Sequence, residues 1–143
     1  EVISHFIFFS ERVLGLLELK WAKVIYPKDK LLCETDVLAR LETRDGKCVN
    51  ILASVGGAQP DRQEMTVRGT AKSRRISEFY KDSESNGLEF IPLREEPRDP
   101  RAVSLKAQLD DLEKVYNGHP NKLATVDEAL RVQVLIESIL SSN

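Results

Sequence analysis

The chain has 143 residues, of which 41% are hydrophobic and 31% charged, and its formal net charge at pH 7 is −2. A chain of this length can bury a core of its own, and the near balance of charges excludes a general attraction to nucleic acid. No apolar run approaches the roughly 20 residues that a membrane span needs. Cys33 and Cys48 form neither a disulfide framework nor a metal-ligand pattern, so we expect reduced thiols, no metal and a cytoplasmic protein.

The chain begins at Glu1, without Met and without a signal-peptide pattern. We therefore expect it to be a piece of a longer protein. Its first fifteen residues, EVISHFIFFSERVLG, predict an amphipathic helix that ends at Gly15. The apolar stripe expected from spacings of three and four consists of Val2, Phe6, Phe9, Val13 and Leu16.

The other face of this first helix carries Glu1, His5 and Arg12, because residues four apart stack one turn above another. A carboxylate one turn from a histidine can orient the imidazole and raise its basicity, as proton transfer near neutral pH requires. The same spacing also occurs as a plain surface contact. Glu1 and His5 are therefore candidate catalytic residues, with a surface contact as the alternative.

Alternating apolar residues then predict about six strands, over residues 19–25, 36–42, 49–55, 65–69, 76–80 and 88–93. In the first strand, Leu19, Trp21, Lys23 and Ile25 are expected on one face and Lys20, Ala22 and Val24 on the other. Residues 44–46, Arg-Asp-Gly, predict a hairpin turn between the second and third strands. Residues 82–87 are expected to be a polar loop, and Pro92 indicates an edge strand.

Two helices are predicted to close the chain. Asp99 is a suitable N-cap with Pro100 at the first helical position, and Asn117-Gly118 ends this helix. Its expected apolar face consists of Leu105, Leu109, Leu112 and Tyr116. Thr125 and Glu128 have the spacing of a capping box, which predicts a last helix running to about Ser141. The fold class expected is α+β, an open and mainly antiparallel sheet with helices packed on one face.

The order Glu1-x-x-x-His5, followed by an apolar helix and a strand, resembles the start of the C-terminal domain of the Gfo/Idh/MocA oxidoreductases, the relatives of glucose–fructose oxidoreductase. Glu1 takes the place of the family's usual Asp, and Phe8 that of a second Asp. The last helix is also similar to the end of these proteins. The matching residues there are Ala124, Thr125, Ala129, Leu130, Gln133, Leu135, Ile136, Glu137 and Ser141.

The resemblance implies that residues 1–143 form a single C-terminal substrate-binding and oligomerisation domain, without the N-terminal Rossmann domain. The parent protein would be an NAD(P)-dependent oxidoreductase acting on a sugar, polyol or related alcohol or ketone. His5 would be the acid or base and Glu1 its orienting partner. The open face of the sheet would be the surface through which two copies form a homodimer. The sequence has no G-x-G-x-x-G, so the NAD or NADP of the parent is not expected to bind here, and the fragment alone is expected to be inactive.

Two alternatives remain open. The same fold can serve as a noncatalytic sugar-sensing or dimerisation module, and the replacements at Glu1 and Phe8 favour that function slightly. An unrelated α+β domain can also share this order of elements, because a fold does not by itself determine function.

Overall fold

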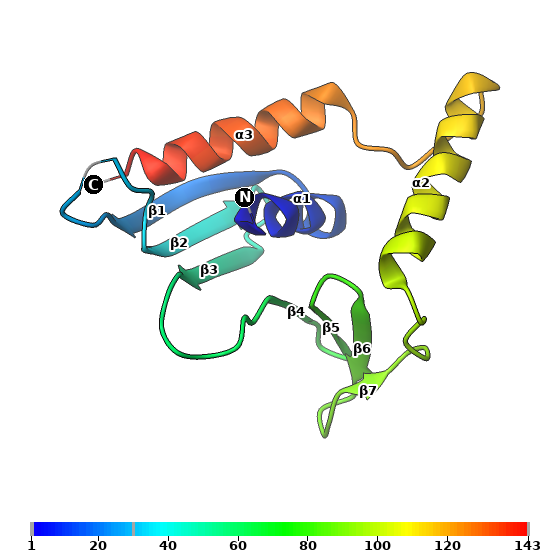
Figure 1. Ribbon diagram of the computed structural model, residues 1–143, viewed down its shortest axis with the longest axis horizontal. Coiled ribbons are helices and arrows are strands. Elements are labelled where there is room, and N and C mark those ends of the chain that lie inside the picture. Colours follow the sequence, from blue (N-terminus) through cyan, green and yellow to red (C-terminus); the bar gives the residue numbers. More distant parts are fainter. Residues whose placement is uncertain (1, 30, 143) are drawn as a thin grey trace. The chain divides into compact units, whose positions relative to one another are not determined.

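The computed structural model of the chain describes residues 2–29 and 31–142 (Figure 1). Contacts between residues divide the chain into two units. The first unit combines the chain up to residue 58 with the chain from residue 124 onward, and the second unit is residues 59–123.

The first unit packs two helices on a three-stranded antiparallel sheet with the strand order β1-β2-β3. Its elements are α1 (Val2–Leu14), β1 (Leu17–Ile25), β2 (Asp36–Thr43), β3 (Cys48–Ser54) and α3 (Val126–Leu140). Figure 1 shows α1 and α3 on the same face of this sheet. The predicted hairpin is confirmed: Gly46 N donates to Thr43 O over 2.9 Å in the turn between β2 and β3.

The core of the first unit lies between this sheet and its two helices. Alternate residues of β2 point into it, because successive side chains of a strand point to opposite faces. The buried apolar side chains are Ile7, Leu17, Val37, Ala39, Leu41, Val132, Leu135 and Ile139. One face of β2 is therefore fully covered, while the other face of the sheet is open.

Helix α1 forms as predicted, but the predicted apolar stripe is wrong. Its core side consists of Ile7 and Ser10 with the half-buried Ile3, whereas Val13 is exposed. The sequence VISHFIFF is apolar nearly all round, so its periodicity does not select one face. Ser10 lies in the core because its hydroxyl donates to Phe6 O over 2.8 Å, which satisfies the buried oxygen.

A β-bulge in β1 overturns the predicted division of its two faces. Between Leu19 and Trp21 the pairing with β2 shifts, and Lys20 has no partner residue. An extra residue in a strand moves the side chains after it to the opposite face. Leu19 therefore packs at the core together with Ala22 and Val24, while Trp21 turns to the open face.

The second unit is built on a four-stranded antiparallel sheet with the order β4-β5-β6-β7. Its elements are β4 (Glu64–Arg68), β5 (Ser73–Ser77), β6 (Lys81–Ser85), β7 (Ile91–Pro92) and α2 (Pro100–Tyr116). Pro92 lies in the edge strand, as predicted. Charged pairs link β5 to β6, among them Arg74 with Asp82 and Glu84. Within residues 59–123, all of which the structure describes, no hydrophobic side chain is buried.

The fifth and sixth strands differ from the prediction. The chain turns at Glu78 and Phe79, which adopt φ angles of 51° and 63°, so β5 ends at Ser77 instead of continuing to Tyr80. Most of the expected polar loop, residues 82–87, is part of β6, with the sequence KDSES. The predicted sixth strand, residues 88–93, is reduced to the two residues of β7. A strand that is polar on both faces has no alternating signal, and cross-strand partners alone determine it.

Helix α2 has the predicted ends. The Asp99 carboxylate accepts hydrogen bonds from the backbone N–H groups of Arg101 and Ala102, Pro100 begins the helix, and Asn117 ends it. The expected apolar face is present but is not buried, since Leu105, Leu109, Leu112 and Tyr116 are all exposed.

The α+β class with open antiparallel sheets is confirmed, with the strands divided between two sheets. None of the described helices has the length and apolar character that a membrane crossing requires.

The stability of the first unit should depend strongly on Leu41, whose exposed fraction is 0%. We expect Leu41→Ala to lower the free energy of unfolding by about 2–5 kcal/mol, because it leaves a cavity between the sheet and the helices. Urea denaturation followed by circular dichroism measures this change. The matched control is Leu31→Ala, at a residue that is 94% exposed, which should change stability by less than about 0.5 kcal/mol. Equal effects of the two substitutions would show that Leu41 is not a core residue.

Candidate functional site

The predicted catalytic histidine lies on α1 and is exposed. His5 points away from the core, because two residues along a helix rotate a side chain by about 200° relative to Ile7. Its predicted partner Glu1 lies outside the described residues. The pairing of Glu1 with His5 therefore stays a prediction.

The same side of α1 carries Phe8 and Arg12, one and two turns after His5. The guanidinium carbon of Arg12 lies 4.9 Å from the centre of the Phe8 ring, a cation–π contact. The ring of Phe9 lies 6.4 Å from that of Phe8 and is tilted by 58°. Phe8 is half-buried and packs against the core, so the exposed surface that follows His5 along the helix is that of Arg12, with the Phe8 ring beside it.

Arg12 connects this surface to the start of α3. Its Nη2 donates to Glu128 Oε2 and its Nε contacts Glu128 Oε1, each over 2.8 Å. Two parallel contacts of this kind fix the orientation of a guanidinium as well as its position. Glu128 is itself held by the predicted capping box: its backbone N–H donates to Thr125 Oγ1 over 3.2 Å, and its Oε2 accepts from Thr125 N over 2.8 Å.

These hydrogen bonds lower the pKa of the Glu128 carboxyl from 4.5 to about 2. The largest cause is the hydrogen bond from Arg12, followed by the one from the backbone N–H of Thr125. Both favour the charged carboxylate over the neutral acid. Glu128 is therefore ionised throughout the physiological pH range.

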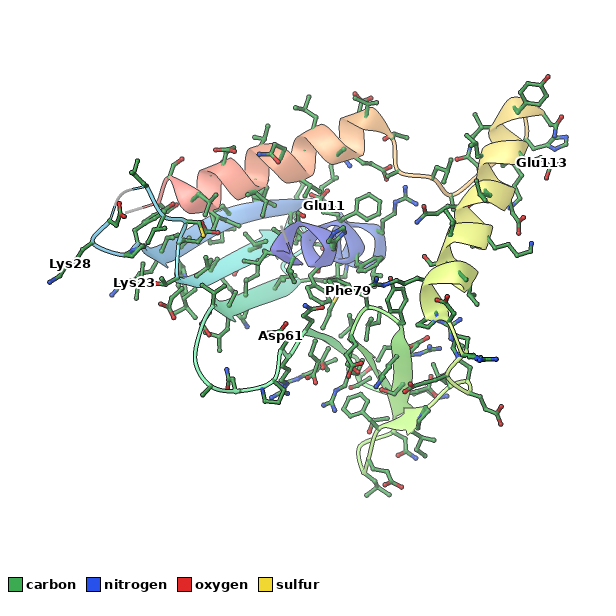
Figure 2. All side chains as sticks on the ribbon, in the orientation of Figure 1. Glu11, Lys23, Lys28, Asp61, Phe79 and Glu113 are labelled. Carbon is green, nitrogen blue, oxygen red and sulfur yellow. The ribbon has the colours of Figure 1, made fainter. Side chains whose placement is uncertain are left out.

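A second charged pair joins the same two helices. The Glu11 side chain is 8% exposed; its Oε1 accepts from Leu17 N over 3.1 Å and its Oε2 lies 3.7 Å from Arg131 Nη2. Figure 2 labels Glu11 on α1. We call Glu11, Arg12, Glu128 and Arg131 the charge clamp. Together with Phe8 and Leu16, these residues line a pocket of about 120 Å³.

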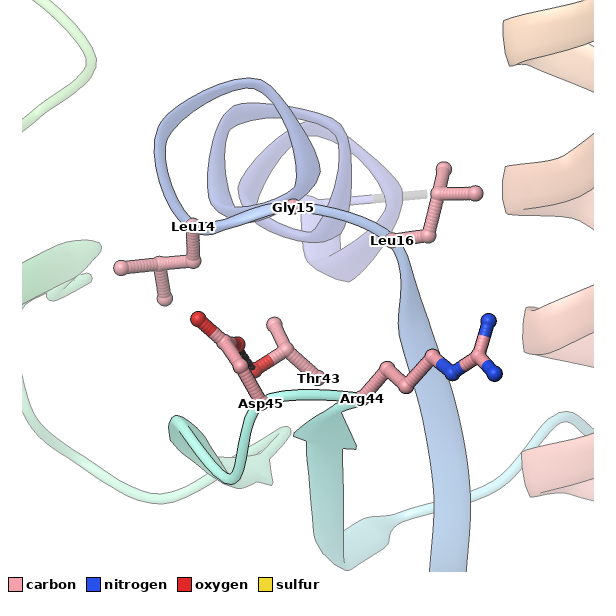
Figure 3. A pocket seen from close by; sticks show the side chains of 6 residues that line it. All are labelled: Leu14, Gly15, Leu16, Thr43, Arg44 and Asp45. Carbon is pink, nitrogen blue, oxygen red and sulfur yellow. Dashed lines mark hydrogen bonds between the residues drawn. The ribbon is translucent and has the colours of Figure 1, made fainter.

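A larger pocket of about 380 Å³ lies where α1 ends (Figure 3). It is lined by Leu14, Gly15, Leu16, Thr43, Arg44 and Asp45. Asp45 accepts from the Thr43 hydroxyl over 2.6 Å, and Lys47 Nζ contacts Asp45 and donates to Leu14 O over 3.3 Å. The hydrogen bonds from Lys47 and Thr43 lower the pKa of Asp45. This pocket is about 13 Å along the helix from His5.

The structure thus brings Arg12 and Phe8 beside the predicted His5 face and adds Glu11, Glu128 and Arg131, which sequence reasoning did not assign to the site. The capping-box spacing identified Glu128, but only as a helix start. Nothing in the sequence indicates that a residue 116 positions after Arg12 contacts it. Among the described residues, no three His, Cys, Asp or Glu side chains gather as a metal site would require.

No protein-family model matches the sequence, and no curated protein matches it significantly. Solved structures do match in fold. The 3-ketoreductase KijD10 from Actinomadura kijaniata, in complex with TDP-benzene and NADP, superposes with a TM-score of 0.70 at 17% identity. The match covers 97% of this chain and 45% of that one.

Two further structures give the same result. The WlbA dehydrogenase from Bordetella pertussis, in complex with NADH and UDP-GlcNAcA, has a TM-score of 0.67 at 16% identity, covering 96% of this chain and 42% of that one. The dehydrogenase MviM from Clostridium difficile has a TM-score of 0.76 at 11% identity, covering 96% and 45%.

These structures are oxidoreductases of the Gfo/Idh/MocA type, and the chain spans less than half of their length. The chain has the α+β fold of the corresponding part of them. The resemblance inferred from the sequence is thereby confirmed as a likeness of fold. Activity, substrate and assembly are separate questions, because one fold serves many functions.

The contact between Arg12 and Glu128 should make stability depend on pH. Because the pKa of Glu128 is lowered from 4.5 to about 2, its carboxylate stabilises the folded chain above about pH 4.5. That contribution is lost as the pH falls from about 4.5 towards 2. We expect the difference in free energy of unfolding between the wild type and Glu128→Gln to be largest near neutral pH and to shrink over that window. Urea denaturation of both chains between about pH 2 and 7 measures it, and a difference independent of pH would contradict the assignment.

Proposed function

We propose that this chain is the substrate-binding and dimerisation domain of an NAD(P)-dependent oxidoreductase that acts on a sugar, polyol or related alcohol or ketone. The likeness of fold to a 3-ketoreductase and two dehydrogenases, over nearly the whole chain, is the observation that carries this proposal. The proposed location is the cytoplasm.

The dinucleotide belongs to a Rossmann domain outside this chain. A pyrophosphate site needs a glycine-rich turn from a strand into the N-terminus of a helix. The one pair of adjacent glycines, Gly56 and Gly57, lies between β3 and β4, so no helix follows it. The residues of this chain therefore do not fit a dinucleotide site, and the substrate side of the reaction is what they can supply.

His5 is the proposed proton-transfer residue. Oxidation of an alcohol requires a group that accepts the hydroxyl proton, and reduction of a ketone requires one that donates it. The exposed position of His5 on α1 leaves its imidazole accessible to a substrate. Glu1 is proposed to orient the ring.

The open face of the β1–β3 sheet is the proposed dimer surface. After the bulge, Trp21 and Ile25 of β1 face outward together with Leu38 of β2 and Leu52 of β3, with exposed fractions from 44% to 84%. Arg40 lies among them and pairs with Glu42 and Asn50. A face that presents both apolar side chains and a satisfied polar group suits a second copy of itself.

A noncatalytic sugar-sensing or dimerisation module is the second candidate. Phe8 stands where the resemblance leads one to expect an acid, and its ring is in contact with Arg12. The replacement of that acid by an aromatic ring favours binding without chemistry. Turnover distinguishes the two candidates.

The first test of the proposed function is His5→Ala in the longer protein that includes the nucleotide-binding half. We expect kcat to fall by about 100- to 10,000-fold, because a general acid–base group contributes about that much. The assay follows NAD(H) or NADP(H) absorbance with a panel of sugars and polyols. His119→Ala is the matched control, since His119 is exposed in the loop between α2 and α3, and it should retain full turnover. Wild-type turnover by His5→Ala would eliminate the catalytic role.

The second test concerns the open sheet face. Leu52→Glu should convert a dimer to monomers, because it places a charge within the proposed apolar contact without disturbing a buried side chain. Sedimentation velocity measures the change, and circular dichroism checks the fold. Leu88→Glu, at a residue of the second unit that is 92% exposed, should leave the dimer intact. A dimer that survives Leu52→Glu would show that the interface lies elsewhere.

A further inference from the structure

The charge clamp joins α1 to α3 with two ion pairs. In one pair the acid comes from α1, and in the other pair it comes from α3. Adjacent residues of α1 supply an acid and then a base, Glu11 and Arg12, while α3 supplies a base and an acid one turn apart, Arg131 and Glu128. Each charge therefore meets its opposite across the helix pair. This arrangement is complementary in only one relative position of the two helices.

A shift of α3 by one turn illustrates the constraint. Glu128 and Arg131 are three residues apart, so they occupy neighbouring turns of the same face of α3. Such a shift would replace Glu128 by Arg131 opposite Arg12 and bring two positive charges together. Like-charge contacts disfavour wrong registers, while opposite charges favour the right one.

The clamp also opposes rotation of α1 about its own axis. The Arg12 guanidinium is held at its edge by both oxygens of Glu128 and at its face by the Phe8 ring. Glu128 cannot follow a moving Arg12 freely, because Thr125 holds the same carboxylate at the first turn of α3. Glu11 is anchored in addition to the first residue of β1.

His5 lies seven residues before Arg12, which is about 10 Å along the same side of α1. Any rotation or sliding of α1 that displaces Arg12 therefore displaces the His5 imidazole by a comparable distance. We propose that the charge clamp sets the position of His5, with Arg12 and Glu128 acting as positioning residues for the site. The inference rests on the proposed function, because it concerns how the proton-transfer residue is presented to a substrate.

Glu128→Gln tests the clamp without removing the helix cap, since Gln also serves in a capping box. Arg12→Gln and the double variant complete a cycle, and Arg12→Lys keeps the charge without the two parallel contacts. Asp127→Asn is the matched control, because it removes an exposed acidic charge from the same turn of α3. The readout is the NMR signal of the His5 imidazole in this chain, with the His119 signal as internal reference.

We expect Arg12→Gln and Glu128→Gln to change the chemical shift of the His5 imidazole in the same way. The double variant should change it no more than either single substitution does. Arg12→Lys should give a smaller displacement, while Asp127→Asn and the His119 signal should stay at their wild-type positions. An unmoved His5 signal, an equal displacement by Asp127→Asn, or additive displacements in the double variant would overturn the proposal.

Kinetics of the longer protein separate this proposal from the proposed function. If the clamp positions His5, Glu128→Gln lowers kcat by on the order of ten- to a hundredfold, with the KM for the dinucleotide unchanged. Full turnover by His5→Ala, together with non-additive changes of the His5 chemical shift in the clamp variants, would contradict the catalytic function and support the clamp. Conversely, His5→Ala could be inactive while Glu128→Gln has the wild-type kcat and an unchanged His5 chemical shift. That result would contradict the clamp and support the function.

Discussion

The contact of Ile7, Leu41 and Ile139 is the constraint on which the first unit depends, because these are its most deeply buried large side chains. They come from α1, β2 and α3, so one apolar cluster fixes both helices on the same face of the sheet. Two consequences follow from this packing. The opposite sheet face remains open, and the side of α1 opposite Ile7, which carries His5, faces outward. Apolar attraction has no preferred direction, whereas the paired charges between α1 and α3 select one register.

Much of the fold could be predicted from residues whose effect is local. The Arg44–Gly46 turn, the Asp99 cap and the Thr125 capping box each act within a few positions, and the structure confirms all three. Prediction failed where the effect depends on distant partners. The polar strand β6 forms because β5 supplies opposite charges, and the core side of α1 is chosen by the sheet, since the first part of the helix, residues 2–9, is apolar nearly all round.

The candidate site likewise has residues that could be predicted from the sequence and residues that could not. The spacing on α1 was sufficient to place His5 and Arg12 on a common side, and the structure agrees with that placement. The partner of Arg12 could not be predicted, because Glu128 comes from the far end of the chain and has a sufficient local role as a helix cap. Glu11 was hidden for a similar reason: a charged residue in a helix is normally solvated, and only the contact with β1 and α3 explains its burial.

The extra residue Lys20, which has no partner residue in β2, has a consequence for how this strand can change during evolution. Removing Lys20 would leave Leu19 opposite Leu41 and Trp21 opposite Arg40 as direct neighbours, so strict alternation would return and every later side chain of β1 would keep its face. Ala22 and Val24 would stay at the core, and Trp21 would stay on the open face. The pairing of β2 with β3 contains no such extra residue, so a deletion of one residue within β2 would move the side chains beyond it to the opposite face. Variation in length is therefore expected to concentrate at Lys20 and in the loop between β1 and β2.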